Sequence, residues 1–213
     1  MRPGWDIIAL VAGFAFAGGW LAVRAAKALA GRTLPLAAAV VVCGLLAAWT
    51  VHVVFGTTAI LASLCLAWAL LVLSIVDWLD FRLPDVLTLP LILAGVAASL
   101  VMPAEHALDH AAAAAVAFAA LWAIAWAYER LRHQEGLGLG DAKLGAAAGA
   151  WLGFEPLPSV LLLASVAGIV WILVGSVTRG REALAERIPF GVPLSLAIWI
   201  VWLYNPLPVA AMA

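Results

Sequence analysis

Four aspartates stand where a carboxyl group could do chemistry. Asp77, Asp80 and Asp85 cluster directly after an apolar run, and Asp141 ends a glycine-rich segment with the pattern Gly-x-Gly-Asp. Carboxylates that turn inward at a membrane boundary are costly, and they usually serve a site. Asp77 follows its apolar run without a break, so it is the acid expected to lie deepest. If Asp77 and Asp141 approach each other, one ionised and one protonated acid could activate water and polarise a peptide carbonyl.

Each acid also has a structural interpretation. Asp85 opens an apolar segment, where its side chain could cap free N–H groups at the start of a helix. Asp80 lies three residues after Asp77, so it could share a helical face with it or be a solvated loop residue. Asp141 could be a helix cap as well. These alternatives stay open on residue types and spacing alone.

Three glycines in alternate positions, Gly136, Gly138 and Gly140, precede Asp141. Glycine permits positive φ and close approach of the backbone. We expect them to bring the acid to a helix start while leaving room for an extended peptide. A phosphate-binding loop fits poorly, because the segment ends in an acid and lacks the Gly-Lys-Ser or Gly-Lys-Thr ending of a P-loop.

The elements that must position these acids are membrane helices. Of the 213 residues, 67% are hydrophobic and 11% charged, too few charges to cover a soluble domain. We expect an all-α, polytopic transmembrane helix bundle of about eight spans, forming a single domain over residues 1–213. The predicted spans are 5–23, 36–55, 57–76, 86–102, 110–127, 142–154, 159–177 and 190–204, and the first is expected to be retained rather than removed as a signal peptide. Segment 142–154 is short for a full crossing.

The basic residues predict an orientation. With alternating connections, every Lys and Arg except Arg2 falls on one side of the membrane. The positive-inside rule places that side in the cytoplasm and both termini on the non-cytoplasmic side. The four aspartates would then lie at the cytoplasmic ends of their spans.

Several classes of function have no support. Cys43 and Cys65 are single residues inside apolar runs, without a CxxC pair or a zinc cluster. No basic stripe suggests a nucleic-acid partner. We therefore expect a lipid bilayer as surroundings, no metal, no other cofactor and no nucleic acid.

Three signatures together resemble a known family. Residues 77–90 hold an acid followed by a hydrophobic-Pro-Asp-x-Leu-Thr-x-Pro turn, residues 136–144 end in Gly-Asp-x-Lys-Leu, and residues 188–191 read Ile-Pro-Phe-Gly. In this order they resemble the prepilin peptidase (type IV leader peptidase) family, membrane aspartyl proteases of the GxGD class. The resemblance covers a core of about 70–205, which leaves residues 1–69 as additional N-terminal spans.

The resemblance implies a catalytic pair, Asp77 and Asp141. It further implies that seven residues shape the loops or the substrate site: Pro84, Asp85, Gly138, Gly140, Lys143, Pro189 and Gly191. The implied substrates are prepilins or pseudopilins of type IV pili or type II secretion, each with a short basic leader before a hydrophobic helix. Cleavage would occur at the cytoplasmic face of the bacterial inner membrane.

The chain departs from the family's bifunctional members in one respect. Those carry a cytoplasmic insert with paired CxxC motifs between their first two spans, together with an N-methylation activity. Here residues 24–34 make that connection and contain no cysteine, so a peptidase without N-methylation is expected.

Two competing interpretations remain on the sequence. Presenilin-type or signal-peptide-peptidase-type proteases share GxGD, but their first acid follows Tyr and their late motif is Pro-Ala-Leu. Here Val76 precedes the first acid, and the late turn is Ile-Pro-Phe-Gly. A membrane transporter or assembly scaffold could use buried acids without proteolysis, although its acids would be expected near the midplane rather than at span ends.

Overall fold

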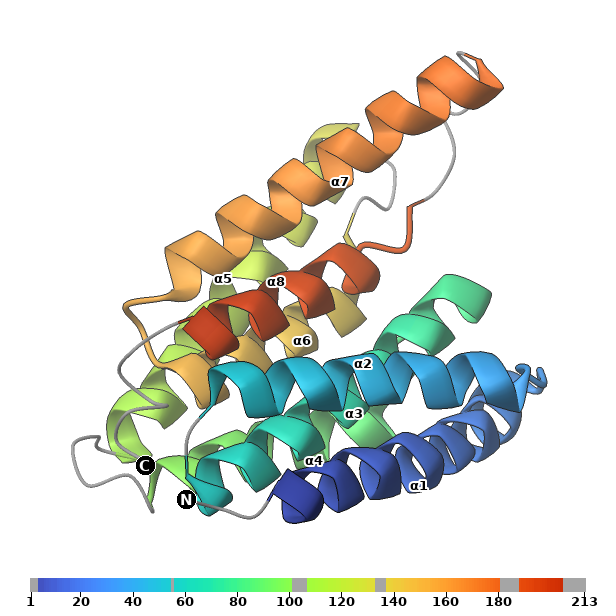
Figure 1. Cartoon of the computed structure of the whole chain (residues 1–213). Coiled ribbons are helices and arrows are strands. Elements are labelled where there is room, and N and C mark those ends of the chain that lie inside the picture. Colours follow the sequence, from blue (N-terminus) through green and yellow to red (C-terminus); the bar gives the residue numbers. More distant parts are fainter. Residues whose placement is uncertain (1–3, 55, 101–106, 133–136, 181–187, 205–213) are drawn as a thin grey trace.

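The chain folds into a bundle of helices. This computed structural model describes residues 4–54, 56–100, 107–132, 137–180 and 188–204. These residues form eight α-helices and no strand (Figure 1), which confirms the predicted all-α class. The helices are α1 (Gly4–Ala30), α2 (Leu36–Val53), α3 (Thr57–Asp80), α4 (Asp85–Ser99), α5 (Ala107–Arg132), α6 (Leu139–Leu152), α7 (Leu157–Arg179) and α8 (Gly191–Tyr204).

The helices fall into two length classes. Five of the described helices (α1, α2, α3, α5 and α7) are long and apolar enough to cross a membrane. The other three are shorter, with 15 residues in α4 and 14 in each of α6 and α8. A helix of 14 residues extends about 21 Å, less than the ~30 Å of a bilayer core. The sixth segment is therefore short, as the sequence predicts.

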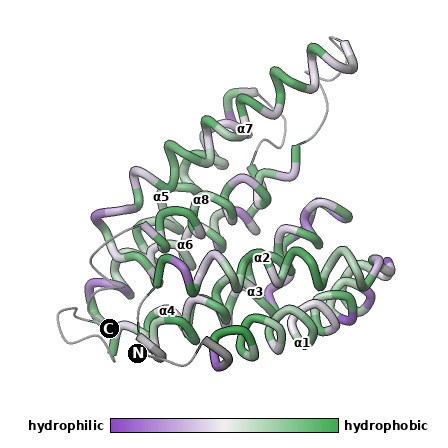
Figure 2. The backbone as a smooth tube through the Cα atoms, in the orientation of Figure 1, coloured by the Kyte–Doolittle hydropathy of each residue, from purple (hydrophilic) through white to green (hydrophobic). Residues whose placement is uncertain are grey.

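The surface of the bundle is apolar and suited to lipid. Phe16, Leu45, Leu93 and Val177 are all exposed, although each is a large hydrophobic residue. Hydrophobic residues cover most of each helix, and hydrophilic residues gather chiefly near helix ends (Figure 2). Exposed apolar side chains of this kind suit contact with lipid, as expected of a multi-pass membrane protein.

The short helix α6 lies inside the bundle. Eleven of its 14 residues are buried, and it packs against α4, α5 and α8, as Figure 1 shows. Trp151 Nε1 donates to the Leu91 carbonyl at 2.9 Å, and His110 Nδ1 donates to the Ala150 carbonyl at 2.9 Å. These bonds join the C-terminal end of α6 to α4 and to the beginning of α5.

Glycines let the neighbouring helices approach α6 closely. A Cβ atom on Gly149 would lie 2.5 Å from the Ala113 carbonyl carbon in α5, and one on Gly145 would lie 2.3 Å from Leu121. On the α4 side, a Cβ on Gly95 would lie 2.8 Å from the Ala150 carbonyl carbon. Such contacts are the packing that small residues permit in membrane bundles, where dispersion replaces the hydrophobic effect.

The two ends of the bundle differ. At one end, Asp6, Gly56 and Ile60 line a common pocket, and Trp49 Nε1 donates to Tyr204 Oη at 3.2 Å. The beginning of α1 and the end of α8 therefore lie at the same end, in keeping with an even number of helices. The opposite end, called the site end below, holds the short connections 31–35 and 81–84 and the first turns of α6 and α8.

The packing of α6 gives a first prediction. Gly149→Ala should destabilise the protein by about 1–3 kcal/mol, because the new methyl group meets backbone of α5 that cannot move alone. Gly13→Ala is the matched control, since no atom lies within 4 Å of its added Cβ and alanine favours a helix. Thermal unfolding of both variants in detergent would test this, and equal melting temperatures would contradict it.

Candidate active site

Asp77 projects from the last turn of α3 into the protein interior. Its side chain is 5% exposed. The backbone N–H groups of Gly191 and Val192, at the beginning of α8, interact with its carboxylate. Oδ2 has no hydrogen-bond partner within the described part of the chain. The first N–H groups of a helix lack partners within that helix and carry partial positive charge, so the α8 start favours a carboxylate here.

Asp141 lies in the first turn of α6 and is 8% exposed. Its Oδ2 accepts a hydrogen bond from the Gly138 N–H at 3.2 Å, which closes the loop in front of the helix. The charge of Asp77 acts on Asp141, so the two carboxyl groups lie within electrostatic range of each other. The structure thus brings together two buried acids from elements far apart in the sequence.

Leu83 packs against the beginnings of α6 and α8, beside the two acids. A Cβ on Gly140 would lie 2.9 Å from Leu83 Cβ, and one on Gly191 would lie 3.1 Å from Leu83 Cδ1. The same added atom on Gly191 would lie 2.8 Å from Asp77 Oδ2. Both glycines therefore make room for the site. The sequence did not single out Leu83, since an apolar residue in an apolar chain carries no signal of its own.

The described glycines of the glycine-rich loop serve close approach of the chain. Gly138 has φ −77°, and neither Gly138 nor Gly140 is among the residues with positive φ. Of the two properties that glycine permits, positive φ is not used at these positions, whereas close approach occurs at Gly140. The third glycine, Gly136, lies outside the described residues. Space, rather than backbone conformation, explains the glycine at position 140.

Asp85 lies at a helix start and carries an ion pair. It is in the first turn of α4, directly after the N-cap residue Pro84. Its carboxylate forms an ion pair with Lys143, two residues after Asp141. The sequence interpretation placed Asp85 at a helix start but did not indicate this ion pair. The pair links the first turns of α4 and α6, while Asp80 pairs locally with Arg82 at 3.7 Å.

The remaining predicted site residues lie in the turns that lead into α4 and α8. Pro84 stands just before α4 with φ −71° and ψ 133°. Pro189 is buried, and its carbonyl accepts a hydrogen bond from the Val192 N–H at 3.2 Å. Among the described residues other than glycine, Phe81 is the one with a left-handed backbone conformation, with φ 53°. Its N–H donates to the Asp77 carbonyl at 2.8 Å, which ends α3 one turn after the acid.

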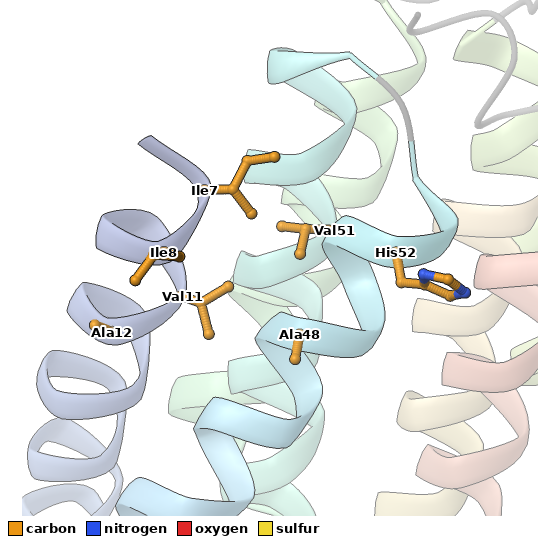
Figure 3. Close-up of a pocket in the computed structure, with 7 residues that line it drawn as sticks. All are labelled: Ile7, Ile8, Val11, Ala12, Ala48, Val51 and His52. Carbon is orange, nitrogen blue, oxygen red and sulfur yellow. The ribbon is translucent and has the colours of Figure 1, made fainter. Parts of the chain in front are cut away.

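A groove at the opposite end of the bundle has no comparable chemistry. It lies between α1 and α2 and is lined mostly by apolar side chains, including Ile7, Val11 and Val51. Figure 3 shows that the His52 ring points away from the other lining side chains. Among the described residues no carboxyl group lines this groove, so the two acids at the site end are the stronger candidate.

Fold and site together define a helical membrane protein with two buried, neighbouring aspartates. Residues 64–173 match the type IV leader peptidase family. Proteins named prepilin leader peptidase/N-methyltransferase from Stutzerimonas stutzeri and Pseudomonas aeruginosa are 36% and 35% identical over 94% and 96% of this chain, and 68% of each relative is covered. The chain belongs to the type IV leader peptidase family.

Other relatives match a smaller share of their length. The Aeromonas hydrophila protein of the same name is 37% identical over 68% of this chain and 50% of its own length. The chain spans about half the length of the curated relatives of this kind. No solved structure matches the chain. The family match includes both acids and excludes the presenilin-type alternative, while the Ile-Pro-Phe-Gly turn lies beyond the matched residues.

The two glycines before Asp141 should respond differently to substitution. Gly140→Ala should lower the stability by about 1–3 kcal/mol, because its methyl group would collide with Leu83. Gly138→Ala should be nearly neutral, since its φ suits any residue and the nearest atom lies 3.6 Å away. Melting temperatures of the two purified variants would decide. A larger loss at Gly138 would contradict this account of the loop.

Proposed function

We propose that this protein is a membrane aspartic endopeptidase that cleaves the leader peptide of type IV prepilins or prepilin-like proteins. The observation that supports the proposal is the burial of Asp77 and Asp141 at the site end of the bundle, within electrostatic range of each other. The chain's family is one of leader peptidases. This membership favours peptide cleavage over a transporter or an assembly scaffold.

The pair would work by sharing a proton. Two adjacent carboxyl groups cannot both ionise cheaply, so one remains protonated and the pair titrates as a unit. The ionised acid takes a proton from water as the water oxygen attacks the scissile carbonyl carbon. The protonated acid donates a hydrogen bond to the carbonyl oxygen. When the C–N bond breaks, the leaving amine takes up a proton, and the net reaction adds one water molecule.

The surrounding groups suit this chemistry. The α8 amides face Asp77, and the Gly138 N–H bonds to Asp141, so each acid is oriented from the backbone. Fixed dipoles of this kind need no reorganisation during the reaction. The Asp85–Lys143 pair joins the helix that follows Asp77 to the helix that bears Asp141, and we assign it a role in holding the two acids in register.

The orientation of the protein follows from charge. We place the site end at the cytoplasmic face of the bacterial inner membrane and both termini on the other side, on the strength of the basic residues in the site-end connections. In a substrate with a basic leader and a hydrophobic helix, the junction between leader and helix would then lie at the depth of the acids. Pilins and pseudopilins both have this design, and either could be the substrate.

We further propose that the protein lacks N-methylation activity. The relatives' names pair the peptidase with an N-methyltransferase. In this chain residues 31–35 connect α1 to α2, and the two cysteines, Cys43 and Cys65, lie within helices. A cysteine-rich insert therefore has no counterpart in this connection.

Substitution of the acids tests the peptidase. Asp77→Asn and Asp141→Asn should each abolish cleavage while the protein still inserts, because an amide can neither take up the proton nor share it. Asp80→Asn is the matched control and should retain most of the activity, since the ion pair that Asp80 forms within the described chain is the local one with Arg82. Membranes holding each variant would be incubated with a prepilin and the mobility shift followed. Full processing by either of the first two variants would exclude the dyad.

The mature product tests the second proposal. Mass measurement of the cleaved pilin N-terminus, with S-adenosylmethionine supplied as methyl donor, should show a free amine. A product heavier by one methyl group would contradict the peptidase-only proposal without touching the assignment of the two acids. A bifunctional relative provides the positive control for the assay.

A further inference from the structure

Three buried polar atoms in the described chain have no hydrogen-bond partner in the protein. They are Asp77 Oδ2, Ser195 Oγ and Trp199 Nε1. The first belongs to the candidate active site. The other two lie on α8, the helix whose first amides face Asp77, and their side chains are 2% and 3% exposed. All three atoms thus lie on α8 or against its first turn.

The geometry of α8 places Ser195 on the side that faces α3. Gly191 lies against Asp77, and Trp202 Nε1 donates to Ser63 Oγ of α3 at 2.8 Å, so both residues mark the α3 side of α8. At about 100° per residue, Ser195 lies about 40° from Gly191 and about 20° from Trp202. Trp199, four residues after Ser195 on α8, lies about 80° from Gly191 around the helix axis. Ser195 and Trp199 therefore continue inward from Asp77, at steps of about 6 Å along the helix.

Ser195 also differs from other hydroxyl residues in these helices. Thr50, Ser74 and Ser99 each donate to a carbonyl three or four residues earlier in their own helix, at 2.7–2.8 Å. This bond normally satisfies a hydroxyl in an apolar helix. The Ser195 hydroxyl does not make it. A buried polar group without a partner is strongly unfavourable, and water is the usual partner where protein supplies none.

We propose that Ser195 and Trp199 hold water between α3 and α8, in contact with Asp77, and that this water supplies the nucleophile for peptide hydrolysis. The inference rests on the proposed peptidase function and deepens it. A short chain of hydrogen-bonded waters would link Asp77 Oδ2 to Ser195 Oγ and then to Trp199 Nε1. The oxygen of each attacking water ends in the new carboxyl group of the leader peptide. Another water then moves along the row of hydrogen-bonded waters to replace it.

The surroundings of the two acids restrict the access of water, and water held by Ser195 and Trp199 would compensate. The outer faces of the helices are apolar, so bulk water does not reach the acids from the lipid side. A peptide bound for cleavage would also cover the acids. Water stored on the far side of Asp77 from the substrate would remain available during cleavage.

The first experiment compares serines on the same bundle. Ser195→Ala should lower kcat at least tenfold with KM changed less than twofold, because water supply and not substrate binding is affected. Ser74→Ala is the matched control near Asp77, since its hydroxyl is satisfied by the Leu70 carbonyl, and it should stay within twofold of wild type. Trp199→Phe should resemble Ser195→Ala, while Trp126→Phe on the exposed face of α5 should not. Equal effects of Ser195→Ala and Ser74→Ala would overturn the inference.

The second experiment detects the water without relying on activity. Thiols react with methanethiosulfonate ethylammonium as thiolates, which form only where water is present. In a background with Cys43→Ala and Cys65→Ala, Ser195→Cys should be modified at least tenfold faster than Ala197→Cys, which is equally buried on α8. Equal rates would overturn the inference. Cleavage by Asp77→Asn would instead overturn the peptidase proposal, so the two failures are distinguishable.

Discussion

The structure depends on holding two buried carboxyl groups within electrostatic range of each other in an apolar protein. Burial alone would make either charge prohibitive, and proximity makes the second charge harder still. The fold offsets this cost by placing each carboxyl group at the N-terminus of a helix. Asp77 meets the first amides of α8, and Asp141 lies in the first turn of α6 with the Gly138 N–H on its oxygen. Because helix N-termini carry partial positive charge, these two helices stabilise negative charge on the acids, as hydration does in water.

The arrangement explains why small residues surround α6. Asp141 can reach Asp77 only if α6 lies in the centre of the bundle, and α6 can lie there only if α4 and α5 approach it closely. Gly95, Gly145 and Gly149 allow that approach, while Gly140 and Gly191 leave space for Leu83 and Asp77. Packing and chemistry are therefore linked through glycine. A methyl group added at one of these glycines would disturb both the helix packing and the placement of the acids.

Much of this could be predicted from the sequence, because apolar segments of helical length and acids at their ends are local patterns. The eight helices of the described chain occur near their predicted places, and the two acids singled out for chemistry lie within electrostatic range of each other. The division at about residue 70 and the roles of the individual site residues stay predictions. What the sequence missed depends on tertiary contact. Asp85 pairs with Lys143, Gly140 is required by Leu83, and the unpaired groups of Ser195 and Trp199 become visible only when every neighbour has been placed.

The shortness of α6 has a consequence for the substrate. Gly149 lies against Ala113 and Gly145 against Leu121, so α6 runs antiparallel to α5 and Asp141 lies level with residues near position 123. From there α5 continues to Arg132, about 10 Å or more beyond the acid. Helix α5 thus extends past the level of Asp141 at the site end. A peptide that approached Asp141 from this end would pass the last turns of α5 before it reached the acid.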